Sequence, residues 1–293
     1  MCSSDLVSIA ISILFHGLAL AMVLYLISVG LSVTMGLMGF VNLAHGAFAM
    51  VGGYVLVLAM KRQGWPFSLS LVAAIIVVVA ISLVLERLLY RRLYGGDELD
   101  QVLLTMGLIF MSVGAATYVF GPVAQTLEPP SWLRGQTQVL GRDFPTYRGF
   151  LIICGAVLVT ALWLALERTR FGAQIRAAVD NLRMAQTLGI NTSKLFAIAF
   201  ALGSGLAALG GGLGADMLSV GPTYALEHLV RFLIVVAVGG LGSIRGPFIA
   251  AVIVGVTDTA FKYLAPELGA FFIYVITMAI LLWRPRGLFG YAR

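Results

Sequence analysis

Long apolar segments restrict the fold of this chain more than any other feature of its sequence. Their lengths lie near the roughly 17 to 25 residues that a helix needs to cross a bilayer. Nine segments qualify, at about 6–30, 34–60, 66–86, 101–121, 149–166, 195–218, 224–240, 247–261 and 268–283. The two between 224 and 261 are short, which suits a helical hairpin or a broken pair. The sequence therefore predicts an all-α, polytopic membrane bundle of about eight or nine spans, some of them short or broken.

The composition agrees with this fold class. The 293 residues are 60% hydrophobic and 11% charged, whereas soluble proteins average about 25% charged residues. We expect one transmembrane domain over residues 1–293. The pI near 9.5 raises the question of a nucleic-acid partner. We expect none, because the positive charge lies in short loops, where it sets membrane orientation.

The distribution of lysine and arginine predicts which loops face the cytoplasm. Twelve of these residues lie in the loops 87–100, 167–194 and 241–246 and at the C-terminus, and six lie on the opposite side, with Arg231 ambiguous near a span end. Cytoplasmic loops carry the excess of positive charge. We therefore expect these three loops and the C-terminus to be cytoplasmic and, with nine spans, the N-terminus to be external.

The segment 167–194 is a polar stretch between two apolar spans. Apolar residues recur there at helical spacing, and polar ones occupy another face: Phe171, Ile175, Ala178, Leu182 and Ala185 against Arg176, Asp180, Arg183 and Thr187. This pattern predicts a basic amphipathic helix that meets a soluble partner at the cytoplasmic surface. The alternative is a helix that lies on anionic lipid.

The loop 121–148 then faces outside. Its prolines, Trp132 and Tyr147 suit an ordered or interfacial segment. It either contacts an external partner or packs as a lid on the ends of the spans.

Two glycine-interrupted segments, Gly36–Tyr54 and Gly239–Gly255, share a glycine cluster, a polar residue and a further glycine before small residues. Such pairs suggest an internal repeat with an unwound site in each half of a transporter. The candidate residues of a translocation path are Asn42, His45, Gly46, Gly242 and Ser243. For Asn42 and His45 the alternative is structural, with Asn42 as a helix cap and His45 bonded to a neighbouring span.

Ionisable residues inside apolar segments are functional candidates by default. Asp258, between Thr257 and Thr259, is the deepest acid. It either binds a substrate ammonium group on the path or lies at the external edge near Lys262. His16 and His228 have no partners at metal-ligand spacing, so we expect structural roles and no metal site. The sequence contains no P-loop and no catalytic triad, which indicates that the chain is not an enzyme.

Three motifs together resemble the LivH-type permeases, the transmembrane subunits of branched-chain amino acid ABC importers. They are VNLAHG within Gly36–Tyr54, the segment Ala177–Leu213, and GGLGSIRGPFIAAVIVG at Gly239–Gly255. The resemblance implies a bacterial inner-membrane permease that works with a second, LivM-like permease, two ATP-binding subunits and an external solute-binding protein. ATP and Mg²⁺ are then bound by the partner ATPases, and no cofactor by this chain.

The resemblance also implies that the cytoplasmic segment docks on an ATPase, through Ala185, Gly189 and Ile190 and more loosely Asp180. The amphipathic pattern adds Phe171, Ile175 and Leu182 to that surface. ATP-driven closure of the ATPases would move the helix Phe171–Leu188 and reorient the spans, with the binding protein docked outside on 121–148 and 219–227.

The substrate stays open at this point. Related permeases carry branched-chain amino acids, which we favour, urea or short amides, or aromatic and other small carboxylates. The few fixed charges in the spans suit a path that leaves selectivity to the binding protein. A stand-alone secondary transporter is the alternative of another class, disfavoured because Asp258 is the only acidic or histidine relay candidate.

Overall fold

The computed structural model describes residues 3–139, 142–267 and 269–289. The helices are α1 (Ser3–Met38), α2 (His45–Gln63), α3 (Phe67–Leu88), α4 (Glu98–Phe120), α5 (Thr146–Arg168), α6 (Arg170–Asp180), α7 (Leu182–Thr187), α8 (Thr192–Leu213), α9 (Tyr224–Gly239), α10 (Arg245–Leu264) and α11 (Gly269–Trp283). Short 3₁₀ turns lie at η1 (Tyr90–Leu93), η2 (Ser131–Leu133) and η3 (Gly214–Asp216). Strands β1 (Gln136–Val139) and β2 (Arg142–Pro145) form an antiparallel hairpin in which Gln136 pairs with Pro145.

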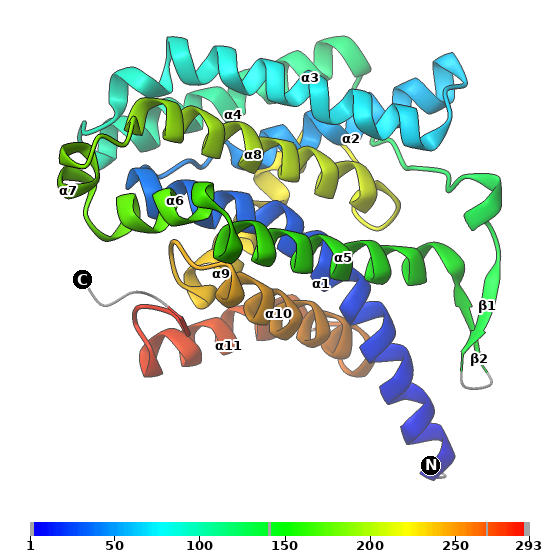
Figure 1. The fold of residues 1–293 in the computed structure, drawn as a ribbon. Coiled ribbons are helices and arrows are strands. Elements are labelled where there is room, and N and C mark those ends of the chain that lie inside the picture. Colours follow the sequence, from blue (N-terminus) through cyan, green and yellow to red (C-terminus); the bar gives the residue numbers. More distant parts are fainter. Residues whose placement is uncertain (1–2, 140–141, 268, 290–293) are drawn as a thin grey trace.

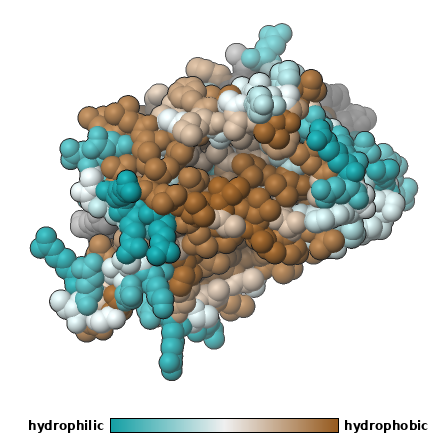
Figure 2. All heavy atoms as spheres, turned by 90° about the horizontal axis from the view of Figure 1, so that it is seen from above, coloured by the Kyte–Doolittle hydropathy of each residue, from teal (hydrophilic) through white to brown (hydrophobic). Residues whose placement is uncertain are grey.

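Each predicted apolar segment coincides with a helix, which confirms the all-α membrane bundle. Among the described residues, six helices are long and apolar enough to cross a bilayer: α1, α3, α4, α5, α8 and α10. The helices α2, α9 and α11 are shorter or less apolar, so the predicted count of eight or nine spans is approximate. Figure 2 shows a broad apolar band with hydrophilic side chains gathered toward opposite ends.

The first break between spans lies later than the sequence predicted. We expected it near 31–33, but α1 continues to Met38 and α2 begins only at His45. Residues 31–33 are Leu, Ser and Val and stay helical, whereas Gly39 has φ +61°, a conformation that glycine adopts without steric cost. The helix therefore ends at this glycine and not at residues 31–33.

Helices α1 and α8 form the centre of the bundle, and α2, α3, α5, α9 and α10 pack around them (Figure 1). Small residues allow the close crossings. A Cβ atom on Gly203 of α8 would lie 3.0 Å from the carbonyl oxygen of Gly30 in α1, and one on Gly52 of α2 would lie 2.5 Å from Cα of Ala208 in α8. The small residues of α8, between Gly203 and Leu213, thus let neighbouring helices pack closely against it, as small residues do in other membrane helices.

The loops predicted to be cytoplasmic lie together at one end of the bundle. Arg245 at the start of α10 pairs with Glu167 at the end of α5, and the ring of Tyr94 packs on Phe196 at the start of α8. Figure 1 places α6 and α7 at this end and the β1–β2 hairpin at the other. At that opposite end Gln125 bridges to Val220. This grouping agrees with the orientation that the basic residues predict.

The segment 167–194 forms more than one helix, whereas the sequence predicted a single amphipathic helix. The side chains of Thr169, Asn181 and Asn191 each accept a hydrogen bond from a backbone N–H at the start of the next helix, at 3.2, 3.0 and 3.0 Å. Residues of this type are preferred N-caps. The predicted single helix Phe171–Leu188 is therefore wrong, because a cap at Asn181 separates α6 from α7.

Candidate functional site

The break between α1 and α2 is closed by polar side chains from other elements. The backbone N–H of Val41 donates to Oε1 of Gln101 at 3.1 Å, and the hydroxyl of Tyr90 donates to Oδ1 of Asn42 at 3.1 Å. Nε2 of His45 lies 3.0 Å from the carbonyl oxygen of Ile27. In an apolar environment irregular backbone needs such partners within the protein. Both side chains are buried, and His45 bonds to the neighbouring helix α1 as the structural alternative expects. The expected cap at Asn42 is wrong, because the N-cap of α2 is Ala44 and the Asn42 side chain instead accepts from Tyr90.

A second polar cluster lies beside this break, at the end of α3. The Tyr94 hydroxyl donates to Oε1 of Glu86 at 3.0 Å. Burial and, next, the nearby Glu86 carboxylate raise the pKa of Tyr94 well above its usual value. Tyr94 therefore remains a neutral donor at physiological pH. Its ring also contacts Phe40 and Phe196, so this tyrosine joins the broken segment to α8.

Replacing Gln101 by leucine should destabilise the protein through the broken segment. The change leaves the partly buried N–H of Val41 without its acceptor, a loss of about 1–3 kcal/mol. We expect a lower midpoint of thermal unfolding for the detergent-purified protein. Thr117→Val in the same helix is the control, since Thr117 is exposed and bonds only to Val113 of its own helix. Equal midpoints for Gln101→Leu and the wild type would contradict this role.

The other glycine and serine candidates lie in close packing between helices. A Cβ atom on Gly46 would lie 3.3 Å from Cα of Ala225 in α9. The N–H of Gly242, at φ +78°, donates to the Ser32 carbonyl at 3.1 Å, and Oγ of Ser243 accepts from the N–H of Gly246 at 2.9 Å. These residues join the α9–α10 turn to α1. The two glycine-interrupted segments are thus brought near each other, at the contact of Gly36 with Gly242.

The apolar face of α6 and α7 is covered by the protein itself. Ile175, Ala178 and Ala185 are buried in a cluster with Leu195 and Phe196 of α8. We placed Ile175 and Ala185 on the docking surface, and the structure corrects this, because a side chain packed on α8 is not free to contact a partner. These residues fix α6 and α7 to the membrane domain.

The exposed part of this element is smaller and lies on α7 and the turn after it. Leu182, Met184 and Leu188 are 37%, 57% and 73% exposed. Asp180 and Gly189 are also exposed, and Phe171 and Ile190 are partly so. A groove of about 430 Å³ runs beside them, lined by Phe171, Gln174, Leu188, Gly189, Ile190, Asn191, Lys194, Leu195 and Ile198. This apolar patch and groove are the surface that α6 and α7 offer to solvent.

Gly189 determines the shape of that surface. It has φ +83°, its N–H donates to the Gln186 carbonyl at 3.0 Å, and the N–H of Ile190 donates to the Ala185 carbonyl at 3.1 Å. This pair of bonds is a Schellman motif, which ends a helix at a left-handed glycine. The predicted helix end is confirmed, with Gly189 one residue after the C-cap Leu188.

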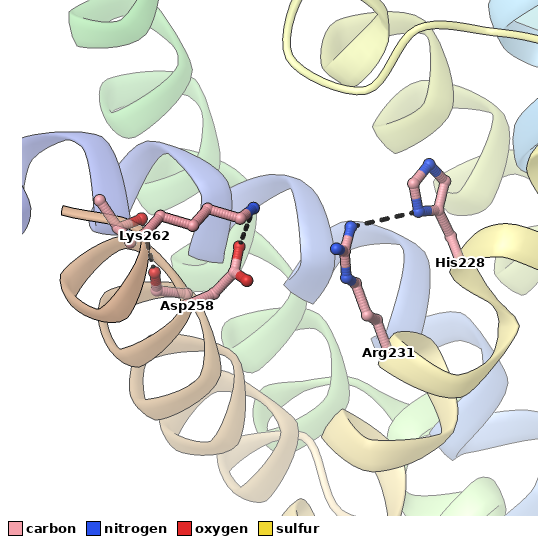
Figure 3. A network of polar contacts seen from close by, with 6 residues as sticks. His228, Arg231, Asp258 and Lys262 are labelled. Carbon is pink, nitrogen blue, oxygen red and sulfur yellow. Dashed lines mark hydrogen bonds and ion pairs between the residues drawn. The ribbon is translucent and has the colours of Figure 1, made fainter. Parts of the chain in front are cut away.

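Asp258 is buried in α10, with 2% exposure, and its Oδ2 accepts from Nζ of Lys262 at 2.6 Å. Figure 3 shows this pair opposite Arg231 and His228 of α9. Nη1 of Arg231 donates to Nδ1 of His228 at 3.4 Å. Of the two expectations for Asp258, proximity to Lys262 is confirmed, but the carboxylate is buried instead of lying at an exposed edge.

Comparison with known proteins decides the family. A model of the family described as "Branched-chain amino acid transport system / permease component" matches residues 13–281. The chain belongs to this family. It is a permease component, and the resemblance stated from the three sequence motifs is confirmed.

Individual relatives resemble this permease over nearly its whole length. The high-affinity branched-chain amino acid transport system permease protein LivH of Salmonella typhimurium is 28% identical, over 94% of each chain. The probable LivH of Methanocaldococcus jannaschii is 28% identical over 91% of this chain and 88% of its own. Among solved structures, PsaBC from Streptococcus pneumoniae in complex with Fab gives a TM-score of 0.49 at 13% identity, covering 92% of this chain and 89% of that chain.

The sequence interpretation missed Arg231. We left it as ambiguous near a span end, but it lies in the middle of α9, about two turns from either end. The signal was present, since an arginine inside the apolar segment 224–240 is unusual in a membrane helix. It was overlooked because the search for buried charges in this permease considered acids and histidines.

Proposed function

We propose that this permease is the membrane subunit of an ATP-driven importer that carries branched-chain amino acids across the inner membrane of a bacterium. It works with a second, LivM-like permease, two ATP-binding subunits and an external solute-binding protein. The family match over residues 13–281 carries this proposal. The names of its relatives favour a branched-chain amino acid over urea, amides or aromatic carboxylates.

The ATPase subunit docks on the exposed patch of α7 and the adjoining groove. Leu182, Met184 and Leu188 provide apolar area, and Asp180, Gly189 and Ile190 border it. An ATPase that grips α7 pulls on the cluster in which Ile175 and Ala185 pack against α8. Movement of the docked subunit is thereby passed to the central helix of the bundle. ATP and Mg²⁺ are bound by that partner.

The binding protein docks at the opposite end, on the loop 121–148 and the segment 219–227. These two segments are joined by reciprocal backbone hydrogen bonds of 2.8 Å between Gln125 and Val220. Trp132 and Val123 are 64% and 68% exposed there. Exposed aromatic residues are common anchors of protein interfaces. Because the bridge ties this loop to the start of α9, docking outside can reach the helix that carries Arg231.

Purification tests the assembly directly. We expect the affinity-tagged permease to co-purify with two ATPase chains and a second permease when its neighbouring genes are expressed with it. Proteoliposomes of that complex should take up L-leucine only with ATP and binding protein present. Uptake by this chain alone, without ATP, would instead establish a secondary transporter.

A further inference from the structure

We infer that Arg231, Lys262 and Asp258 form a solute site that holds an α-amino acid by its carboxylate and ammonium groups on the way through the membrane. This inference rests on the proposed function and names residues of the translocation path.

The position of Arg231 requires a polar environment. It lies in the middle of α9, half-buried, whereas lipid-facing positions in the middle of a helix exclude charge. Lys262, whose side chain is 53% exposed, extends from α10 toward it (Figure 3). Charged side chains at such depth face a water-filled path or another subunit. We assign the face of α9 that carries Arg231 to the path, with Lys262 in the last turn of α10 beside it.

The charges of the cluster leave room for a carboxylate. Lys262 pairs with Asp258, but Arg231 forms no ion pair with any residue that the structure describes. Its hydrogen bond to His228 uses one of five N–H donors. Glu227 accepts from the Thr223 hydroxyl of its own turn. Of the two cations, only Lys262 thus has an ion-pair partner among the described residues, and the guanidinium of Arg231 presents the paired donors that match a carboxylate in two-point contact.

Asp258 supplies the complementary half of the site. Its Oδ1 atom is fully buried and has no hydrogen-bond partner among the described residues, although Oδ2 is bonded to Lys262. A buried carboxylate oxygen without a donor is unfavourable. The ammonium group of an amino acid is a donor of the right charge for this atom in a conformation of the permease that opens the space beside it. One amino acid, with its carboxylate at Arg231 and its ammonium group at Asp258, would therefore give a partner both to the unpaired guanidinium and to the Oδ1 atom.

His228 positions Arg231. Its ring is buried, packs edge-to-face on Tyr224 at 4.6 Å and accepts the hydrogen bond from Nη1. The imidazole therefore limits the orientations that the guanidinium can take. A fixed guanidinium loses less conformational entropy when it binds an anion.

Photolabelling of the assembled importer tests this site. The probe is a leucine analogue with a diazirine on its side chain and free carboxylate and ammonium groups, activated during ATP-driven uptake in proteoliposomes. We expect labelled peptides from α9 and α10 in the wild type, with excess L-leucine competing. Labelling confined to other helices would overturn the site, even if substitutions of Arg231 and Lys262 lowered uptake.

Substitutions then assign the charges. Arg231→Gln and Lys262→Gln should lower both labelling and leucine uptake by roughly tenfold or more, because charge-assisted hydrogen bonds are lost. Arg231→Lys should give an intermediate loss, since it keeps the charge without the two-point contact. Lys61→Gln, at the exposed end of α2, is the control and should behave as the wild type. Normal labelling and uptake in both glutamine variants would overturn the inference, while a wild-type complex without ATP-dependent leucine uptake would refute the proposed function itself.

Discussion

Replacing Leu182 by aspartate should separate the permease from its ATPase and abolish ATP-dependent uptake. Leu182 is the first residue of α7, where an acidic side chain is favourable to the helix, so the fold of α7 is retained. The charge is instead placed in the apolar docking patch. Residues central to an interface contribute about 2 kcal/mol or more, roughly a 30-fold change in affinity. The measurements are the ATPase content of the purified complex and leucine uptake in proteoliposomes.

The matched control for this variant is Val7→Asp. Val7 is 57% exposed, near the start of α1 at the opposite end of the bundle. We expect this variant to keep its full ATPase content. Wild-type ATPase content in Leu182→Asp, with uptake intact, would show that α7 is not the docking site and would favour a segment that lies on lipid.

Replacing Gly52 by valine should prevent the bundle from folding. A Cβ atom at this position would lie 2.5 Å from Cα and 2.6 Å from the carbonyl oxygen of Ala208, both backbone atoms of α8. The two helices must separate to admit the side chain. Overpacking of a core costs about 1–3 kcal/mol, and we expect about 3 kcal/mol or more here because backbone atoms clash. Little protein should elute as a folded species in size-exclusion chromatography.

Gly107→Val in α4 is the control, because no heavy atom lies within 4 Å of a Cβ atom at Gly107. It should elute as the wild type does. If Gly52→Val gave the same yield of folded protein as Gly107→Val, the result would contradict the close packing of α2 against α8 at Gly52.

Local sequence features predicted most of the helices and the ends of several. The apolar segments gave each membrane helix, since about 20 apolar residues have few stable arrangements other than a span. Gly189 predicted the end of α7 because few residues other than glycine adopt φ +83° without strain. The helix end before Asn181 was not predicted. Its side chain caps α7, but the helical periodicity of the apolar residues continues across it and suggested one helix.

The roles of the candidate residues were less predictable. The helical spacing of apolar residues predicted which face of α6 and α7 is apolar. It did not predict that α8 of the same chain covers part of this face. Ile175 and Ala185 pack on α8, and only Leu182 and its neighbours remain exposed. The sequence shows that Asn42 is a polar residue in an apolar segment, but not that its hydrogen-bond partner is Tyr90 of another element. A partner that is distant in sequence leaves no local pattern.

The sequence by itself determined that this chain is a multi-pass permease of the branched-chain amino acid transport family and where most of its helices run, and it predicts how the chain is oriented. These properties depend on local composition, on short motifs and on the distribution of positive charge, all of which are read along the chain. Only the tertiary structure decided which apolar face is already covered and that Arg231 lies opposite the pair of Lys262 and the buried Asp258. Burial and the approach of α9 to α10 depend on helices that meet in space, whereas the pair of Asp258 and Lys262 lies within one helix and could be expected from their spacing.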